Sequence, residues 1–473
     1  MKVLAVTSEL YPLIKTGGLA DVAGALPAAL APEGISVTTL IPGYPVVMKA
    51  LLAPKHVMHI DSLFGGPADV LASKVRGLDL FVLDAPHLFA RAGNPYMGPD
   101  GIDWQDNGQR FAGLSQVAAQ LARTLKFDAV HLHDWQAGLT AAYLKYMGGP
   151  PSIITIHNLA FQGWFPVSLF ASLGLPPSAF TIDGLEYHGG VGFLKAGMAL
   201  ANAITTVSPS YAREIQTVQD GMGLSGLLRT RASHLHGILN GIDLDVWNPA
   251  TDKSLTRHYD PKSLPARVEN KRALEKRLAL EPSNGPLFCI VSRLTGQKGM
   301  DLVVAAVDGI IARGGRLAVL GAGEPELQVG FAAAAARHPG QIGISTAYDE
   351  PLSHLMQAGS DVILIPSRFE PCGLTQLYAM RYGCVPLVSR VGGLADTVID
   401  ANDAALAAGT ASGIMFAPVT QLAFEQALDR AFALYNDKAA WTSLQTTGMS
   451  SQLGWGRSAK RYAELFRSLV EKS

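Results

Sequence analysis

Residues 1–22 read MKVLAVTSELYPLIKTGGLADV: a short apolar run, a polar loop, and the start of an apolar helical pattern. The run at 2–6 predicts a buried β-strand, because the polar residues that follow end it too early for a secretory signal. Gly17 and Gly18 let backbone N–H groups approach a ligand, the following helix offers its N-terminus to an anion, and Lys15 adds positive charge. We expect either a phosphate or sugar-phosphate site here, or an ordinary turn beside a solvated lysine.

Short apolar runs recur along the chain, each ended by a loop and followed by a longer helical pattern. This alternation predicts βαβ units and a mainly parallel sheet. It occurs twice in 473 residues, which favours an α/β protein of two doubly wound domains. The expected strands are residues 2–6, 36–41, 129–132, 152–156, 203–207 and 236–239 in the first half, and 287–291, 316–320, 341–344, 362–365, 385–388 and 413–416 in the second.

A proline-rich segment at 247–285 indicates the boundary between the two domains. The terminal stretch is amphipathic and follows a finished second domain, so it has to pack elsewhere. Two such sheets imply a cleft, with ligand-binding loops at the carboxyl ends of the strands. The expected domains are 1–245, 246–456 and a terminal helix at 457–473.

The composition excludes several classes of protein. Lysine and arginine total 38 against 39 aspartates and glutamates, a net charge of -1 that argues against nucleic-acid and anionic-membrane partners. No stretch approaches the roughly 18 apolar residues that a membrane helix needs. The three cysteines are odd in number and too sparse for a disulfide framework, which favours a reducing compartment. We therefore expect a soluble cytoplasmic protein.

Two loops in the second half carry charge after predicted strands. Arg293 and Lys298 lie five residues apart on one loop and could converge on a diphosphate leaving group. On the next, Glu370 could accept hydrogen bonds from sugar hydroxyls, while the backbone N–H groups of residues 373–375 open a helix toward phosphate. The alternatives are two surface cations and an acid stabilised by the helix dipole.

Polar residues also follow strands in the first half. Asp134, His157 and Asn240 all stand at strand ends that would face the cleft. A lone histidine is more often structural than catalytic, but His157 ends an apolar strand where a parallel sheet binds ligands. His131 and His133 alternate as a metal pair does, yet no third ligand stands at a telling spacing, so we expect no metal there.

Two shorter signals remain. Tyr348 follows a strand of the second half and could stack on a nucleobase, or could be an ordinary aromatic rim residue. Asp243 and Asp245 match the D-x-D pattern that holds a metal in one class of glycosyltransferases, but matches of three residues arise easily by chance. Because Arg293 and Lys298 already supply positive charge, we expect no essential metal.

Four stretches together resemble the glycogen and starch synthase family of bacteria and plants: KTGGLADV at 15–22, HDWQAG at 133–138, NGID at 240–243 and RFEPCGL at 368–374. The resemblance runs end to end. It implies a GT-B fold, with two Rossmann-like domains facing across a deep cleft and a C-terminal helix crossing back to the first. It implies a retaining glucosyltransferase that uses ADP-glucose and an α-1,4-glucan such as glycogen, with no cofactor.

The same resemblance implies roles for individual residues. It assigns catalysis to Glu370, His157, Lys298, Arg293 and Asp134. It assigns nucleotide-sugar binding to Lys15, Gly17, Gly18, Asp21, Asn240, Arg293, Lys298, Tyr348, Glu370, Cys372, Gly373, Leu374 and Thr375. Tyr96 lies in a region that resembles the family's acceptor surface.

One departure and three rivals bear on this interpretation. The wider GT-B pattern has a second glutamate where this chain has Tyr378, which puts any role of a second carboxylate in doubt. The rivals are a retaining GT-B transferase using UDP-glucose, a non-catalytic glucan-binding protein, and a nucleotide-dependent oxidoreductase. The last lacks its fingerprint, since Glu326 stands where the third glycine belongs. With no obvious carboxylate pair, we favour a front-face route in which the departing diphosphate deprotonates the acceptor.

Overall fold

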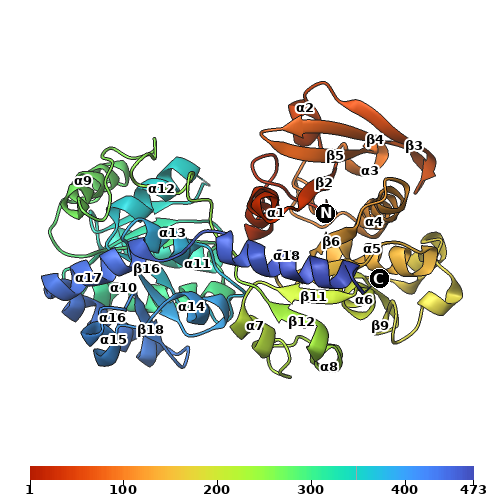
Figure 1. Ribbon diagram of the computed structural model, residues 1–473. Helices are drawn as coiled ribbons and strands as arrows, with labels where there is room; N and C mark the ends of the chain where they lie inside the picture. The colour runs from red at the N-terminus through yellow and green to blue at the C-terminus, as the bar shows by residue number, and fades with distance from the viewer. Residues whose placement is uncertain (348, 473) are drawn as a thin grey trace. The chain divides into compact units, whose positions relative to one another are not determined.

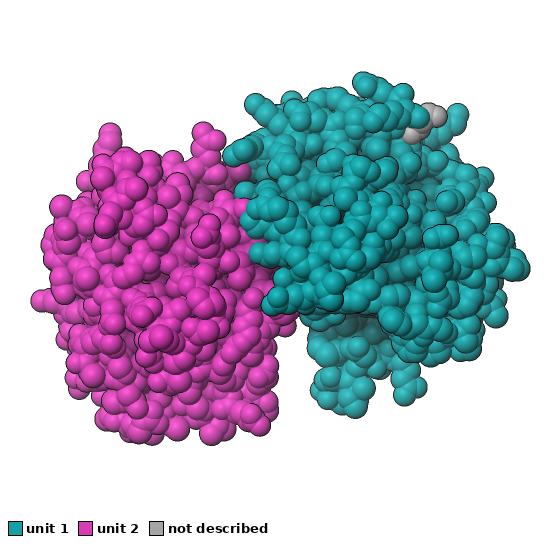
Figure 2. Space-filling model, turned by 90° about the horizontal axis from the view of Figure 1, so that it is seen from below, with its two compact units in different colours: residues 1–240, 455–473 teal, residues 241–454 magenta. Residues whose placement is uncertain are grey.

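Both predicted parallel sheets are present in the computed structural model, which describes residues 1–347 and 349–472 (Figure 1). The chain forms two compact units, coloured separately in Figure 2. The first consists of Met1–Asn240 and Trp455–Ser473, and the second of Gly241–Gly454. The sequence had placed these two boundaries after residues 245 and 456.

The main sheet of the first unit is parallel over most of its width, with β1 at its centre. Val3 of β1 lies opposite Val37 on one side and Ala129 on the other. The strand order is β12 (Leu235–Gly237), β11 (Ala203–Thr206), β7 (Ser152–Ile156), β6 (Ala129–His133), β1 (Lys2–Val6), β2 (Ser36–Pro42), β5 (Leu78–Asp84), β4 (Gly66–Val75) and β3 (Lys55–Leu63).

The sequence did not predict β3, β4 and β5. β4 pairs antiparallel with both of its neighbours, and β3 forms the edge of the sheet. Many side chains of β3 are exposed, so its polar residues break the apolar run by which the other strands were found. A second, antiparallel sheet was also missed, because its strands are very short: β8 (Trp164–Phe165), β10 (Gly190–Gly192) and β9 (Glu186–Tyr187).

The alternating side chains of β1 enter two different cores. Leu4 and Val6 belong to a cluster on one face of the sheet, whereas Val3 and Ala5 belong to a cluster on the other. A strand buried on both faces is typical of a doubly wound domain. The helices of this unit are α1 (Gly18–Leu30), α2 (Pro45–Ala50), α3 (Pro86–Phe89), α4 (Asn107–Thr124), α5 (Asp134–Met147), α6 (Phe193–Leu200), α7 (Pro209–Glu214), α8 (Ser225–Thr230) and α18 (Gly456–Val470).

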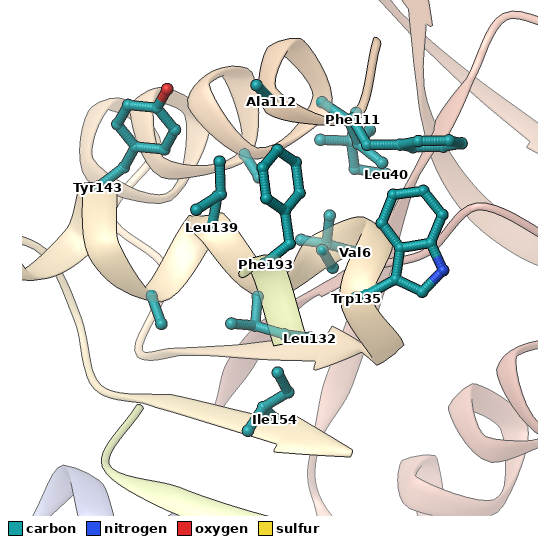
Figure 3. Packing of buried hydrophobic residues seen from close by; sticks show 14 of the residues in the cluster. Val6, Leu40, Phe111, Ala112, Leu132, Trp135, Leu139, Tyr143, Ile154 and Phe193 are labelled. Atoms are coloured by element: carbon teal, nitrogen blue, oxygen red, sulfur yellow. The ribbon is translucent and has the colours of Figure 1, made fainter. Parts of the chain in front are cut away.

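Aromatic residues fill the core on the side of α4 and α5 (Figure 3). The rings of Phe111 and Trp135 meet edge to face with centroids 5.0 Å apart. α5 and α6 approach closely at Gly138, where a Cβ atom would lie 2.3 Å from the carbonyl oxygen of Phe193. These contacts fix the start of α5, whose first residue is the predicted site residue Asp134.

The terminal helix α18 belongs to the first unit and packs against α1 and β6. It buries Tyr462, Ala463 and Phe466 in the core that contains Val3 and Ala5. Burying each large apolar side chain contributes about 1.5 to 3 kcal/mol. None of the helices in the described part of the chain is long and apolar enough to cross a membrane.

The sheet of the second unit is parallel throughout, and its central strand is again buried on both faces. Phe288 and Ile290 point into one core, and Leu287 and Cys289 into the other. The strand order is β15 (Ile342–Ser345), β14 (Arg316–Leu320), β13 (Leu287–Val291), β16 (Val362–Ile365), β17 (Val385–Ser389) and β18 (Ile414–Phe416). The helices are α9 (Arg267–Arg277), α10 (Met300–Ala312), α11 (Pro325–Arg337), α12 (Glu350–Gly359), α13 (Thr375–Arg381), α14 (Gly392–Thr397), α15 (Asp403–Ala407), α16 (Gln421–Asn436) and α17 (Lys438–Ser450).

Candidate active site

The glycine loop after β1 leads directly into α1, which begins at Gly18. The ammonium group of Lys15 lies 2.8 Å from Oδ1 of Asp21, one turn into that helix. The two side chains keep exposed fractions of 29% and 21%. The loop therefore presents a positive charge that is paired with a carboxylate and still open to water.

A buried carboxylate that the sequence reasoning missed holds this loop in place. Glu9 is 3% exposed and accepts hydrogen bonds from both the backbone N–H and the hydroxyl of Thr16, the latter at 2.5 Å. It also accepts one from the N–H of Gly17 at 3.2 Å. The sequence offered one signal for Glu9, its position just past β1. Buried acids rarely occur without partners, and here the glycine loop supplies them. Glu9 thus satisfies the backbone donors at the base of the loop.

Tyr96, predicted at the acceptor surface, is tied to the same carboxylate. Its hydroxyl donates to Oε1 of Glu9 at 2.5 Å and lies 2.9 Å from Oγ of Ser8. Its ring packs against Phe111 and Trp135, and burial raises the pKa of its phenol well above the ordinary value. The polar end of Tyr96 is therefore engaged inside the unit.

Asp134 and His157, predicted from separate strands, lie together. Asp134 begins α5 with a left-handed φ of 55° and accepts a hydrogen bond at 2.7 Å from the backbone N–H of His157. Burial raises the pKa of Asp134 to about 8, against the opposing effect of the His157 and Asn158 backbone donors. At neutral pH this carboxyl is mainly protonated.

Three histidines form a column across β6 and β7. Nδ1 of His133 lies 2.9 Å from Nε2 of His157, and Nε2 of His131 lies 2.6 Å from the hydroxyl of Thr155. Burial lowers the pKa of all three imidazoles, to about 3 for His133. They are neutral at physiological pH, and hydrogen bonds fix how the His157 ring is oriented.

Asn240 closes the first unit, three residues after β12. The residue is 9% exposed, and its buried Oδ1 accepts no hydrogen bond from the described part of the chain. Buried amide oxygens are normally satisfied, so an orphaned one is a candidate acceptor for a ligand hydroxyl.

In the second unit, two predicted site residues form an ion pair. The ammonium group of Lys298 lies 2.5 Å from Oε2 of Glu370, which also accepts a hydrogen bond from Ser367 at 2.9 Å. Glu370 is 6% exposed. Its other oxygen, Oε1, accepts no hydrogen bond from any described residue, so it remains available to a substrate.

The Lys298 loop is held against the Glu370 loop. At Gly299, φ is +69° and a Cβ atom would lie 2.0 Å from the carbonyl oxygen of Pro366, so a side chain would force the loops apart. Arg368, which the sequence reasoning did not single out, binds both oxygens of Asp301 at 2.7 Å. Arg293 is exposed and forms no ion pair with a described residue.

The loop after Glu370 is also fixed from several sides. Gly373 has φ +71°, and the side-chain amide of Gln376 donates to the carbonyl oxygens of Cys372 and Gly373. The N–H of Gly393 donates to the carbonyl of Glu370 at 3.1 Å. α13 begins at Thr375, where the sequence predicted a helix to open, and Leu374 occupies its N-cap position without a side-chain hydrogen bond.

Comparisons with known proteins match both halves of the chain. Residues 2–230 match the starch synthase catalytic domain, and residues 271–443 match glycosyl transferases group 1. A glycogen synthase from Rhodopseudomonas palustris is 57% identical over 477 residues, covering 99% of both chains. Glycogen synthase 1 from Rhizobium meliloti is 55% identical over 479 residues, covering 100% of both. The chain belongs to the glycogen and starch synthase family.

Solved structures of other proteins show the same fold. The catalytic domain of starch synthase IV from Arabidopsis thaliana, bound to ADP and acarbose, superimposes with a TM-score of 0.91 at 32% identity, covering 99% of both chains. A sucrose-phosphate synthase from Thermosynechococcus elongatus, at 17% identity and a TM-score of 0.62, shares the fold. The predicted GT-B fold with Rossmann-like units is thereby confirmed.

Two tyrosines singled out in the sequence remain to be placed. Tyr348, expected to stack on adenine, lies outside the described residues. Tyr378, which replaces the second glutamate of the wider GT-B pattern, stacks on Trp247 with ring centroids 3.6 Å apart and planes 14° apart. In this member of the family an aromatic contact occupies that position.

Proposed function

We propose that this protein transfers glucose from ADP-glucose to the non-reducing 4-hydroxyl of an α-1,4-glucan, with retention of the anomeric configuration. The observation that carries the proposal is the ion pair of Lys298 and Glu370, at a strand end, with one carboxylate oxygen left unoccupied. Membership of the glycogen and starch synthase family supports it, as does the relative solved with ADP and acarbose.

The proposal assigns the diphosphate of the donor to cationic groups. Lys298 supplies a point charge, and the exposed guanidinium of Arg293 supplies a planar pair of donors suited to phosphate. Lys15 contributes from the first unit, beside the exposed Gly17 and Gly18, although Gly17 already donates its N–H to Glu9. Because Lys15 is paired with Asp21, a bound phosphate would share or displace that contact.

In this proposal, side chains that can accept hydrogen bonds hold the hydroxyl groups of the transferred glucose. Oε1 of Glu370 and Oδ1 of Asn240 lack partners among the described residues, and each can accept a bond from a sugar hydroxyl. In His157, Nε2 is engaged with His133, so Nδ1 remains for the substrate. A hydroxyl matched to such buried groups gives strong selectivity for a sugar.

The chemistry we propose takes place on one face of the sugar. The bond from C1 to the leaving phosphate breaks, a bond from C1 to the acceptor O4 forms, and the acceptor proton moves to a phosphate oxygen of the departing ADP. A carboxylate nucleophile is not required, and Asp134, with its pKa raised to about 8, is mainly neutral and poorly suited to be one. Lys298, Arg293 and Lys15 stabilise the charge that develops on the diphosphate.

The proposal includes no essential metal and no cofactor, because these three cations supply the charge that a divalent ion supplies in other transferases. The decisive experiment measures glucose incorporation into glycogen from ADP-glucose and, separately, from UDP-glucose, each with and without EDTA. We expect EDTA-resistant incorporation that prefers ADP-glucose, produces linkages cleaved by an α-1,4-specific hydrolase, and collapses in Glu370→Ala. Preference for UDP-glucose would reassign the donor, and glucan binding without incorporation would reject the enzyme.

A further inference from the structure

A group of metal-ligating side chains lies at the edge of the first unit's sheet, outside the candidate active site. His56 and His59 of β3 and Asp69 of β4 place one ligand atom each within 4.8 Å of one another. Nε2 of His56 lies 2.9 Å from Oδ1 of Asp69, and Nδ1 of His59 lies 2.7 Å from the same oxygen.

A local irregularity of the strand brings the two histidines together. Residues three apart on a regular strand point to opposite faces of the sheet. The register of β3 against β4 shifts between His56 and Met58, a bulge that supplies one extra residue. His59 then pairs directly with Asp69 across the ladder, and both imidazoles meet the same carboxylate.

A fourth side chain lies beside one of the two imidazoles. Nε2 of His59 lies 3.5 Å from Oδ1 of Asp61, while Nδ1 faces Asp69. Without an ion, the short contact with Asp69 places a proton on Nδ1 of His59. A metal ion that takes Nδ1 displaces that proton and leaves the ring proton on Nε2, which faces Asp61. This pairing of carboxylate and imidazole is the outer arrangement that metal-bound histidines commonly have.

The group is also open to ions in solution. The side chains of His56, His59 and Asp69 are 56%, 51% and 40% exposed. An exposed site needs no entry path and keeps room for water as a further ligand. Asp61 and Asp69 together give the surrounding surface a negative charge that attracts cations.

We propose that His56 Nε2, His59 Nδ1 and the Asp69 carboxylate bind a divalent transition-metal cation, with zinc as the best fit. Two imidazoles and one carboxylate with water at the fourth position form a common zinc ligand set, and imidazole disfavours magnesium and calcium. Ligand atoms about 2.0 to 2.2 Å from zinc lie roughly 3.3 Å apart in a tetrahedron, so these exposed side chains need only small shifts.

The bound ion would fasten the edge strand β3 to β4 across the bulge. An ion that binds the folded chain better than the unfolded one raises stability by mass action. The expected consequence is a zinc-dependent rise in the unfolding temperature, while glucosyl transfer stays independent of metal.

The test uses the full chain after removal of metals with a chelator. Isothermal titration with zinc should show one site per chain, cobalt should give the visible absorption of a low-symmetry site, and magnesium should give neither. His59→Ala and Asp69→Asn should abolish the zinc signal and the rise in unfolding temperature. Asp61→Asn should weaken binding about tenfold or more, because it changes only the outer partner.

His234→Ala is the matched control, since His234 is another exposed histidine of the first unit, and its zinc binding should equal that of the wild type. The ligand residues are exposed, so folding of each variant can be verified by its far-ultraviolet spectrum before titration. Zinc binding of equal strength in wild type and His59→Ala, or no saturable binding by the wild type, would overturn the proposal. Either outcome leaves glucosyl transfer, measured with EDTA present, as a separate question.

Discussion

The ammonium group of Lys298 lies 2.5 Å from Oε2 of Glu370, although the two residues are 72 positions apart in the chain. Sequence reasoning had given them separate tasks, phosphate binding for the lysine and sugar binding for the glutamate. Their contact means that each sets the position and charge environment of the other. A substitution at either residue should therefore disturb both parts of the bound nucleotide sugar.

Lys298→Ala should lower kcat about a hundredfold to a thousandfold, with a smaller effect on KM for the donor. In the proposed mechanism this charge acts mainly on the diphosphate as it departs, and removing one such contact in a desolvated site costs about 2.7 to 4 kcal/mol of transition-state stabilisation. Steady-state kinetics with ADP-glucose checks this. Arg313→Ala, which breaks an exposed ion pair with Asp429 in the same unit, is the control and should stay within about twofold.

Arg293→Ala should reduce turnover about tenfold to a hundredfold and leave the unfolding temperature unchanged. The guanidinium is exposed and has no ion-pair partner among described residues, so its removal costs the folded state little, within about 0.5 kcal/mol. Kinetics and thermal unfolding of the same preparation separate the two effects. A clear loss of stability together with unchanged turnover would show that Arg293 is a structural residue.

Much of the fold could be predicted because its central strands are buried on both faces. β1, β7, β13, β14 and β16 have the predicted limits, since each is an apolar run bounded by polar or glycine residues. β3 was missed because an exposed edge strand has no such run, and its bulge further breaks the alternation. The strand expected at 236–239 instead spans Leu235–Gly237, a shift typical of short terminal strands.

The sequence could indicate candidate site residues only where polar side chains follow the carboxyl ends of parallel strands. That rule singled out Asp134, His157 and Glu370 as candidates, and they follow β6, β7 and β16. It did not reveal that Glu9, also past a strand, is the residue that orders the glycine loop. Contacts between distant loops, such as Arg368 with Asp301, depend on packing that no local pattern encodes.

Glu9→Ala should destabilise the first unit and impair catalysis more than a conservative change does. The substitution leaves the part-buried backbone donors of Thr16 and Gly17 without their acceptor, and each lost hydrogen bond costs about 0.5 to 1.5 kcal/mol. Urea unfolding and kcat/KM for ADP-glucose measure the two consequences.

Two milder variants bracket that result. Glu9→Gln keeps an oxygen for the backbone donors, and Tyr96→Phe removes one hydrogen bond from the other carboxylate oxygen. Each should cost about 1 kcal/mol and spare most of the activity. If Tyr96→Phe were as damaging to kcat/KM as Glu9→Ala while leaving stability intact, the Tyr96 hydroxyl would have a direct role with the substrate.

The buried Asp134 should make the stability of the protein fall as the pH rises. Its pKa is raised by burial from an ordinary value near 4 to about 8, so the folded chain holds a proton that the unfolded chain releases. The resulting stabilisation is complete below about pH 4 and is lost as the pH rises toward 8.

The comparison with Asp134→Asn isolates that contribution, because the amide does not titrate and can still accept the His157 N–H bond. The free energy of unfolding of wild type minus that of the variant should decrease steadily between about pH 4 and pH 8. The neighbouring histidines are present in both proteins; their lowered pKa values destabilise both as the pH falls below about 6.5, so this effect largely cancels in the difference. A difference that stays flat over most of this range, and rises with pH only below about pH 5, would mean that Asp134 is ionised in the folded chain and stabilised there by its backbone donors.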